Sequence, residues 1–183
     1  LRVIDYKSGA RKFDPTLVYW GLQLQLLLYL AAALSRVPGS HAAGFFYCRI
    51  ADPTVKTESR IREEVEKQIA KKLSLQGISL SDVAILRAQG GSVASMVTKD
   101  GKPNGRYAAS MVDEAGMEKL LDFAKRKAAE LAGEIYRGEM DDSPVERGAF
   151  NACQNCEYSA ICAFDPLRKP RRRLTAKKLD DLL

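Results

Sequence analysis

The segment Val3-Ile4-Asp5-Tyr6-Lys7-Ser8-Gly9 has the pattern of a β-strand that runs into a turn. Successive side chains of a strand point to opposite faces, so Asp5 and Lys7 lie beside each other on one face. A carboxylate in this position can hold Mg²⁺, and an ammonium next to it can orient water or balance charge on a phosphate. An exposed ion pair on a strand has the same pattern, so the two residues need support from the rest of the chain.

The composition predicts one globular domain. The 183 residues are 46% apolar, which is enough to bury a core, and the longest apolar run, residues 26–34, is shorter than the roughly 20 residues that span a bilayer. The chain opens at Leu1 without a methionine, signal peptide or transit segment. We therefore expect a cytoplasmic fragment of a longer protein, with no membrane span.

The positive charge is concentrated at one end. Residues 168–183 form a basic C-terminal tail that carries +5 of the formal net charge of +6. A solvated, partly disordered end and a segment that contacts phosphates or a partner protein are both consistent with this composition.

Hydrophobic periodicity predicts an α/β fold with a mixed central sheet flanked by helices. The expected strands cover residues 1–7, 43–50 and 93–98, and the expected helices cover residues 15–35, 58–73, 81–88 and 113–138. The helix over 58–73 should pack on the sheet from outside. In the first helix, Gly21, Gln25 and Tyr29 should share a face because they are four residues apart.

Three cysteines near the C-terminus have the spacing of a metal-ligand set. Cys153, Cys156 and Cys162 lie within ten residues, and in a chain without secretory features this spacing favours metal binding over disulfides. Iron and zinc both fit the spacing, and three ligands are one fewer than usual. The remaining cysteine, Cys48, lies in an apolar strand and is interpreted as a buried thiol.

Four segments occur in an order that is specific when they are taken together. They are Val3–Gly9, Tyr19–Leu30 (YWGLQLQLLLYL), Phe46–Pro53 (FYCRIADP) and Cys153–Asp165 (CQNCEYSAICAFD). With them the chain resembles the RecB-family branch of the PD-(D/E)xK nucleases, and within it the AddB-type domains of bacterial AddAB helicase–nucleases. CRISPR-associated RecB-like exonucleases are the nearest alternative within the branch.

The resemblance implies a restriction-endonuclease-like core and a role for each matching residue. Asp5 would be the second carboxylate that binds Mg²⁺, and Tyr6 would offer its backbone carbonyl to the ion. Lys7 would be the catalytic lysine. Gln25 and Tyr29 would form the Gln-x3-Tyr motif, which lies beside the active site and orients the lysine or contacts DNA.

The resemblance also assigns the cysteines and the order of the parts. Cys153, Cys156 and Cys162 would be three ligands of a structural [4Fe–4S] cluster that staples the C-terminal segment to the nuclease core, with the fourth cysteine outside this chain. The parts would be a partial RecB-like core over residues 1–150, a cysteine segment over residues 151–167 and the basic tail.

One departure from the family pattern concerns catalysis. The first catalytic aspartate of the family lies upstream, in a D-R-x-D-like segment that these 183 residues do not contain. The core would then be incomplete on its N-terminal side. We expect this chain to be inactive alone, although the domain from which it comes is active.

The resemblance implies a Mg²⁺-dependent exonuclease domain of an ATP-dependent helicase–nuclease. It would hydrolyse DNA phosphodiesters at double-strand ends for recombinational repair, in a heterodimer with an AddA-type helicase–nuclease subunit. A non-catalytic module that binds DNA ends, docks a subunit and is stapled by a metal cluster is the main alternative. A zinc-stapled interaction domain with a coincidental Asp-x-Lys pair fits each motif separately but does not explain their joint order.

Overall fold

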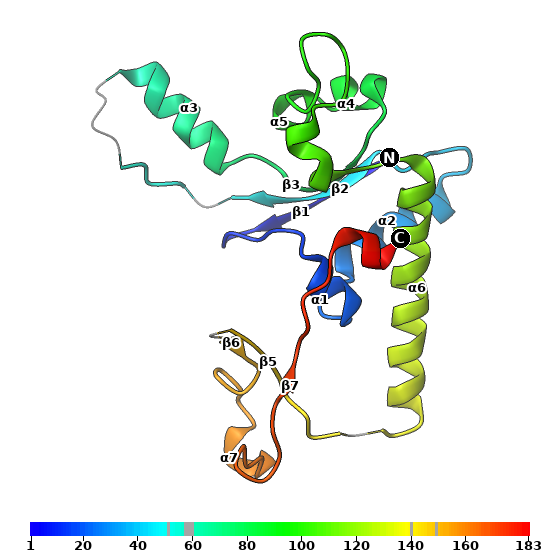
Figure 1. Ribbon diagram of the computed structural model, residues 1–183, viewed down its shortest axis with the longest axis vertical. Coiled ribbons are helices and arrows are strands. Elements are labelled where there is room, and N and C mark those ends of the chain that lie inside the picture. Colours follow the sequence, from blue (N-terminus) through cyan, green and yellow to red (C-terminus); the bar gives the residue numbers. More distant parts are fainter. Residues whose placement is uncertain (51, 57–60, 140, 149) are drawn as a thin grey trace.

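A mixed four-stranded sheet forms the centre of the protein (Figure 1). The computed structural model describes residues 1–50, 52–56, 61–139, 141–148 and 150–183. In the sheet, β1 is parallel to β2, β2 is antiparallel to β3, and β3 is parallel to β4. The predicted mixed α/β architecture is confirmed. The strands are β1 (Arg2–Lys7), β2 (Gly44–Arg49), β3 (Gln76–Leu80) and β4 (Met111–Val112).

Most of the helices lie around this sheet, and a smaller sheet lies beyond it (Figure 1). The helical elements are α1 (Pro15–Tyr19), α2 (Gln25–Arg36), α3 (Arg62–Lys72), α4 (Val83–Gln89), α5 (Gly91–Ala94), η1 (Gly105–Ser110), α6 (Glu114–Tyr136), α7 (Ser159–Cys162) and η2 (Leu179–Leu182). The second sheet has the strand order β6 (Phe150–Asn151), β5 (Val145–Arg147), β7 (Arg172–Arg173).

The two faces of the central sheet carry separate cores. Phe45 and Tyr47 of β2 point to the face that α2 and α6 cover, where the main cluster of buried apolar side chains lies. Phe46 points to the opposite face and packs with Leu86 of α4 and Val93 of α5. The alternation along β2 therefore buries both sides of the strand and holds it in register beside β1.

The first helix is shorter than expected, and this correction affects the site. The single helix predicted over residues 15–35 is wrong, because α1 ends at Tyr19 and α2 begins at Gln25. Gly21 lies in the connection with a φ of 79°, in the left-handed region that favours glycine. A Cβ atom at this position would lie 2.7 Å from Leu131 of α6. Gly21 therefore shares no helical face with Gln25.

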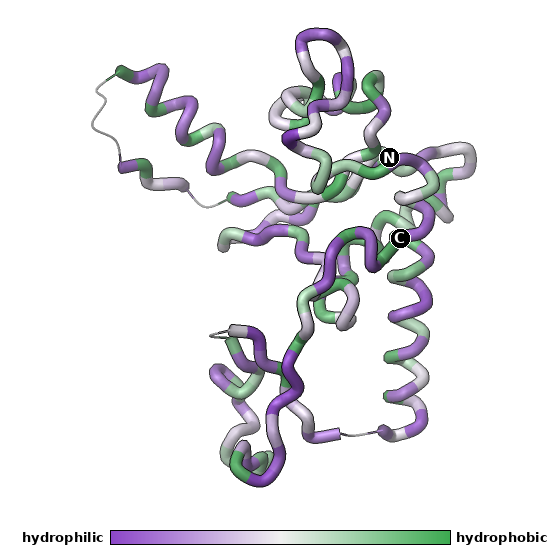
Figure 2. Tube along the Cα trace, viewed as in Figure 1, coloured by the Kyte–Doolittle hydropathy of each residue, from purple (hydrophilic) through white to green (hydrophobic). Residues whose placement is uncertain are grey.

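The helix expected over residues 58–73 forms as α3, but its expected packing is wrong. Residues 58–60 lie outside the described part of the chain, and the helix begins at Arg62. None of its residues is buried, and it projects away from the sheet (Figure 1). Figure 2 shows α3 as mainly hydrophilic, so it has too little apolar surface to cover a sheet.

Residues 93–98 do not form the expected strand. Val93 belongs to α5, and Val97 makes only an isolated antiparallel bridge with Pro103 across the turn. The strands β3 and β4 were not predicted. They are short, and Gly77 interrupts the apolar pattern of β3, so the periodicity signal is weak there.

The last part of the chain packs back on the core. Leu174 and Leu182 are buried, and the backbone amide of Lys177 donates to Thr16 Oγ1 of α1 at 3.0 Å. The ammonium of Lys177 lies 4.3 Å from the ring centroid of Tyr19. Residues 174–182 thus act as a strap across α1 and α6. Within the described residues, no helix has the length and apolar character needed to cross a bilayer.

Candidate active site

Asp5 and Lys7 form an ion pair at the carboxyl end of β1, which is an edge strand of the central sheet. Lys7 Nζ lies 2.7 Å from Asp5 Oδ2, with 30% of the Lys7 side chain and 16% of the Asp5 side chain exposed. In the parallel pairing with β2, Asp5 lies beside Tyr47 and Lys7 beside Arg49. The pair therefore faces the side of the sheet that α2 covers.

The first turn of α2 brings two more of the predicted site residues to this pair. Lys7 Nζ donates to Gln25 Oε1 at 3.4 Å, and Gln25 Nε2 donates to the Tyr29 hydroxyl at 3.0 Å. Gln25 is the first residue of α2, and Tyr29 lies one turn further along the same face. The four side chains form one chain of contacts from Asp5 to the solvent-exposed Tyr29.

Tyr6 lies between the two charged residues in sequence, but its side chain points to the opposite face and is exposed. A metal contact from Tyr6 would therefore come from the backbone carbonyl, as expected. That contact stays a prediction.

Gln23 holds the start of α2 in place, and it was not predicted from the sequence. Its side chain is 7% exposed. Its Nε2 donates to the carbonyl of Lys12 at 2.8 Å, and its Oε1 accepts from the amide of Asp14 at 2.8 Å. Both partners lie in the loop that joins β1 to α1. A buried glutamine within a leucine-rich segment is the signal that could have identified it, because such a side chain needs backbone partners.

A cleft of about 260 Å³ opens beside Lys7. Arg11, Gln25 and Tyr47 also line it. Burial raises the pKa of the Tyr47 phenol, the charge of Arg11 works against this, and the charge of Asp5 adds to it. Tyr47 thus remains neutral and contributes a polar floor to the cleft.

The carboxylate of Asp5 fits one part of a magnesium site. Its Oδ2 is buried and, apart from the ion pair with Lys7, has no partner in the described part of the chain. Carboxylate oxygen is the ligand that Mg²⁺ prefers. Among the described residues, however, no group of three or more His, Cys, Asp or Glu side chains is placed to hold a metal ion. Asp5 therefore needs additional ligands.

Cys162 is the last residue of α7, and Cys153 and Cys156 lie shortly before this helix, in the smaller part of the molecule (Figure 1). All four thiols of the chain are free. Cys153 and Cys156 are partly buried and Cys162 is exposed, and, within the residues that the structure describes, these three are not gathered into a metal-binding group. Cys48 lies in β2, as expected, but is only partly buried. The donor set matches iron or zinc in chemical type, and its geometry is not that of a closed site.

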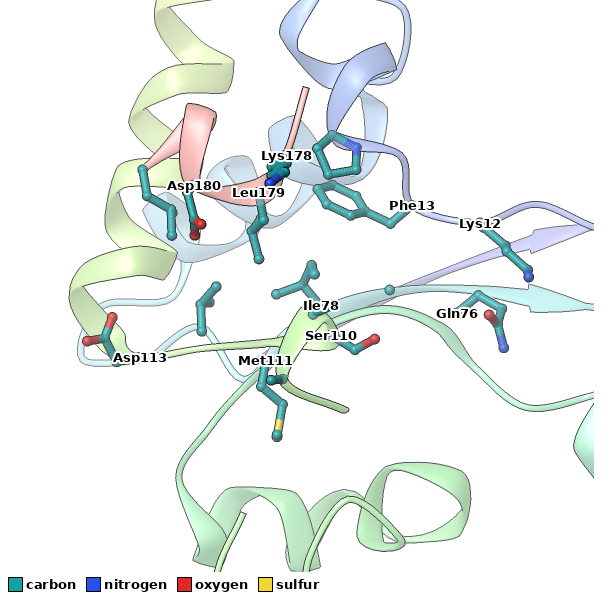
Figure 3. A pocket seen from close by; sticks show the side chains of 16 residues that line it. Lys12, Phe13, Gln76, Ile78, Ser110, Met111, Asp113, Lys178, Leu179 and Asp180 are labelled. Atoms are coloured by element: carbon teal, nitrogen blue, oxygen red, sulfur yellow. The ribbon is translucent and has the colours of Figure 1, made fainter. Parts of the chain in front are cut away.

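A larger cavity in the described part of the chain lies elsewhere and does not contain the predicted catalytic residues. It has a volume of about 740 Å³ between β3, β4 and the C-terminal strap. Figure 3 shows the apolar side chains of Phe13, Ile78, Met111 and Leu179 around it. Cavity size alone would thus point away from Asp5 and Lys7.

Comparison with known proteins supplies a family match. The model of the PD-(D/E)XK nuclease superfamily matches residues 1–163. A relative from Alkaliphilus metalliredigens is 37% identical over 177 residues, which cover 90% of this chain and 15% of the relative. A relative from Desulforudis audaxviator is 37% identical over 199 residues, which cover 100% of this chain and 17% of the relative. Both are named as a subunit of an ATP-dependent helicase/deoxyribonuclease. The chain thus spans about one sixth of their length.

Proposed function

The chain belongs to the PD-(D/E)XK nuclease superfamily, and from this we infer that it is the nuclease domain of a helicase–nuclease subunit that hydrolyses DNA phosphodiesters at double-strand ends. The contact chain from Asp5 through Lys7 and Gln25 to Tyr29 carries this proposal. These residue types in the matching family order would have no reason to meet in a module that only binds DNA ends.

Each side chain has a role that follows from its position. Asp5 is the carboxylate that would hold Mg²⁺, and the bound ion would supply Lewis-acid stabilisation of the phosphate. Lys7 would donate a hydrogen bond that orients an attacking water or contacts a phosphate oxygen, where its positive charge stabilises the negative charge that develops. Gln25 fixes the lysine, and Tyr29 fixes Gln25.

The remaining metal ligands would come from outside this chain. Because β1 is an edge strand, a further strand could pair with its free edge and bring a second carboxylate to Asp5. The chain alone would then bind the metal weakly and cleave poorly.

The three cysteines would be ligands of a [4Fe–4S] cluster whose fourth ligand also lies outside the chain. Free thiols fit a cytoplasmic protein, in which thiols stay reduced and available to metals. Such a cluster would hold the segment around α7 in place rather than take part in hydrolysis.

The partner would be a second helicase–nuclease subunit of the AddA type. The relatives are named as one subunit of an ATP-dependent helicase/deoxyribonuclease, which supports an assembly with at least one other subunit. The partner would feed a DNA strand to the site.

The test is Mg²⁺-dependent degradation of single-stranded DNA by a version of the protein extended upstream toward the length of its relatives. The Asp5→Ala variant should lose cleavage, whereas Asp100→Ala, which changes an exposed carboxylate in a turn, should retain it. Equal inactivity of the folded wild type and of Asp5→Ala would favour the non-catalytic, end-binding module.

A further inference from the structure

We propose that a second cleft, which adjoins the cleft of about 260 Å³ beside Lys7, binds the phosphate backbone of one DNA strand and leads it to Lys7. This proposal rests on the proposed function, because it assigns the path of the substrate. The cleft has a volume of about 340 Å³ and lies between the loop after β1, the end of β2 and the end of α3. We call it the cationic cleft.

The charge of this cleft is of one sign. Six cationic side chains line it, and no carboxylate of the described residues does. The cations come from segments far apart in the sequence, so the fold gathers them. They are Lys7, Arg11, Lys12, Arg49, Lys71 and Lys72.

Several of these cations have no counter-charge. In the part of the chain that the structure describes, Arg11, Arg49 and Lys71 make no salt bridge, whereas Lys127 and Arg137 on α6 and just after it pair with glutamates. Arg49 Nε is also buried without a hydrogen-bond partner among the described residues. Like charges held together without counter-ions cost free energy, which an anionic ligand recovers.

The cationic cleft adjoins the cleft of about 260 Å³ beside Lys7. Lys7, Arg11 and Tyr47 line both of them. Gly9 and Ala10 form the lip beside Lys7, and a side chain added at Gly9 would meet nothing within 4 Å. A phosphate backbone that contacts the end of α3 and Arg49 would therefore also reach Lys7, which lines the same cleft.

The size of the cleft favours a single strand. Cavities of a few hundred Å³ enclose a ligand of drug-like size, and the backbone of a nucleotide or two has this size. A duplex is too wide to enter. Proteins that bind single strands use a positively charged groove that follows the backbone.

The test measures binding separately from cleavage. Fluorescence anisotropy with labelled dT20, in EDTA and about 0.1 M salt, reports affinity for the full chain without hydrolysis. The variants are Arg11→Gln, Arg49→Gln and Lys71→Gln, alone and combined. Lys67→Gln on α3 and Arg87→Gln on α4 are matched controls, because both residues are exposed and line neither cleft.

Each substitution in the cleft should weaken dT20 binding about 5-fold, because it removes one phosphate contact. For single strands, one such contact contributes about 0.7 to the slope of log K for binding against log salt concentration. The triple variant should bind dT20 about 100-fold more weakly than the wild type. The slope of its log K against log salt concentration should be smaller by about 2 units. Arg49→Lys should retain most of the affinity, and the control variants should bind like the wild type. The urea midpoint of each variant shows that the variant is folded.

A triple variant that binds dT20 within 2-fold of the wild type would overturn the proposal. The single-strand assignment would be overturned if a 20-bp duplex bound more tightly than dT20, and if the variants lost affinity for the duplex but not for dT20. Failure of the proposed function is a different result: cleavage would then not depend on Asp5, while the loss of dT20 binding in the variants would still support the cationic cleft.

Discussion

Lys7 Nζ lies 2.7 Å from Asp5 Oδ2, and the two residues are separated by one residue on an edge strand. The ammonium lies at the buried Oδ2, which is an oxygen that a metal ion would also use as a ligand. A cation bound at Asp5 would compete with Lys7 for Oδ2, and Gln25 Oε1, 3.4 Å from Lys7 Nζ, would still accept a hydrogen bond from the ammonium. We therefore expect Gln25 to act as a positioning residue for Lys7.

Gln25→Ala should lower kcat for DNA cleavage by about 10- to 100-fold and change KM little, because a misplaced Lys7 affects the transition state more than substrate binding. Tyr29→Phe should have a smaller effect in the same direction, since it removes only the hydroxyl that accepts from Gln25. Ser35→Ala, at the far end of α2, is the control. Steady-state cleavage of a labelled single strand by the upstream-extended protein measures both constants. An unchanged kcat in Gln25→Ala would remove Gln25 from the site.

Gln23→Leu should destabilise the fold by about 1–3 kcal/mol. The substitution leaves the carbonyl of Lys12 and the amide of Asp14 without their buried partner. Gln68→Leu, at an exposed position of α3, should change stability by less than about 0.5 kcal/mol. Urea denaturation of the two variants measures the difference, and equal midpoints would show that Gln23 does not hold the loop.

The contact between Asp14 and Arg147 should make stability depend on pH. Burial raises the pKa of Asp14, but the hydrogen bond and charge of Arg147, together with the amide of Thr16, outweigh it, so this pKa lies below the ordinary value of 3.8. A carboxyl with a lowered pKa in the folded state stabilises the protein above its unfolded pKa. That contribution is lost as the pH falls through the folded pKa.

We therefore expect the free energy of unfolding to fall below about pH 4. The fall should be shallower in Arg147→Gln, which removes the partner that lowers this pKa. Arg106→Gln, at an exposed position, is the control. Urea midpoints across this pH range measure the effect. Identical pH profiles of the wild type and Arg147→Gln would contradict the assigned cause.

Substitution of the cysteines tests the proposed cluster. Cys153→Ser and Cys156→Ser should each lower the iron content of the anaerobically purified, upstream-extended protein to near zero, because each removes one thiolate ligand. Cys48→Ser should leave the content unchanged, since Cys48 lies in β2. Metal analysis and visible absorption are the measurements. Zinc in place of iron in the wild type would contradict the iron–sulfur assignment.

The local features of the site could be predicted from sequence. Strand alternation placed Asp5 and Lys7 on one face, and helical spacing placed Gln25 and Tyr29 one turn apart. The break in the first helix could not be predicted from the sequence. Leu131 approaches Gly21 so closely that only glycine fits there, and this is a tertiary contact that local patterns do not indicate.

The cationic cleft could not be predicted from the sequence either, because it also depends on tertiary contacts. Arg11, Arg49 and Lys71 are scattered along the chain, and outside the tail the acidic residues nearly balance the basic ones. Only the pairing of β1 with β2 and the position of the end of α3 bring these cations together. The expected packing of α3 failed because periodicity indicates a helix but not what covers it.

The most direct test of the central claim separates binding from chemistry at Lys7. Single-turnover hydrolysis of labelled dT20 with Mg²⁺ should be measured for the upstream-extended protein, for Lys7→Met and for the control Lys67→Met, an exposed lysine of α3 that lines neither cleft. We predict that Lys7→Met binds dT20 within several-fold of the wild type but loses cleavage by about 100-fold or more, because it removes a charge that acts in the transition state. Lys67→Met should cleave at close to the wild-type rate. Full cleavage by Lys7→Met would contradict the catalytic role of this lysine and with it the proposed site.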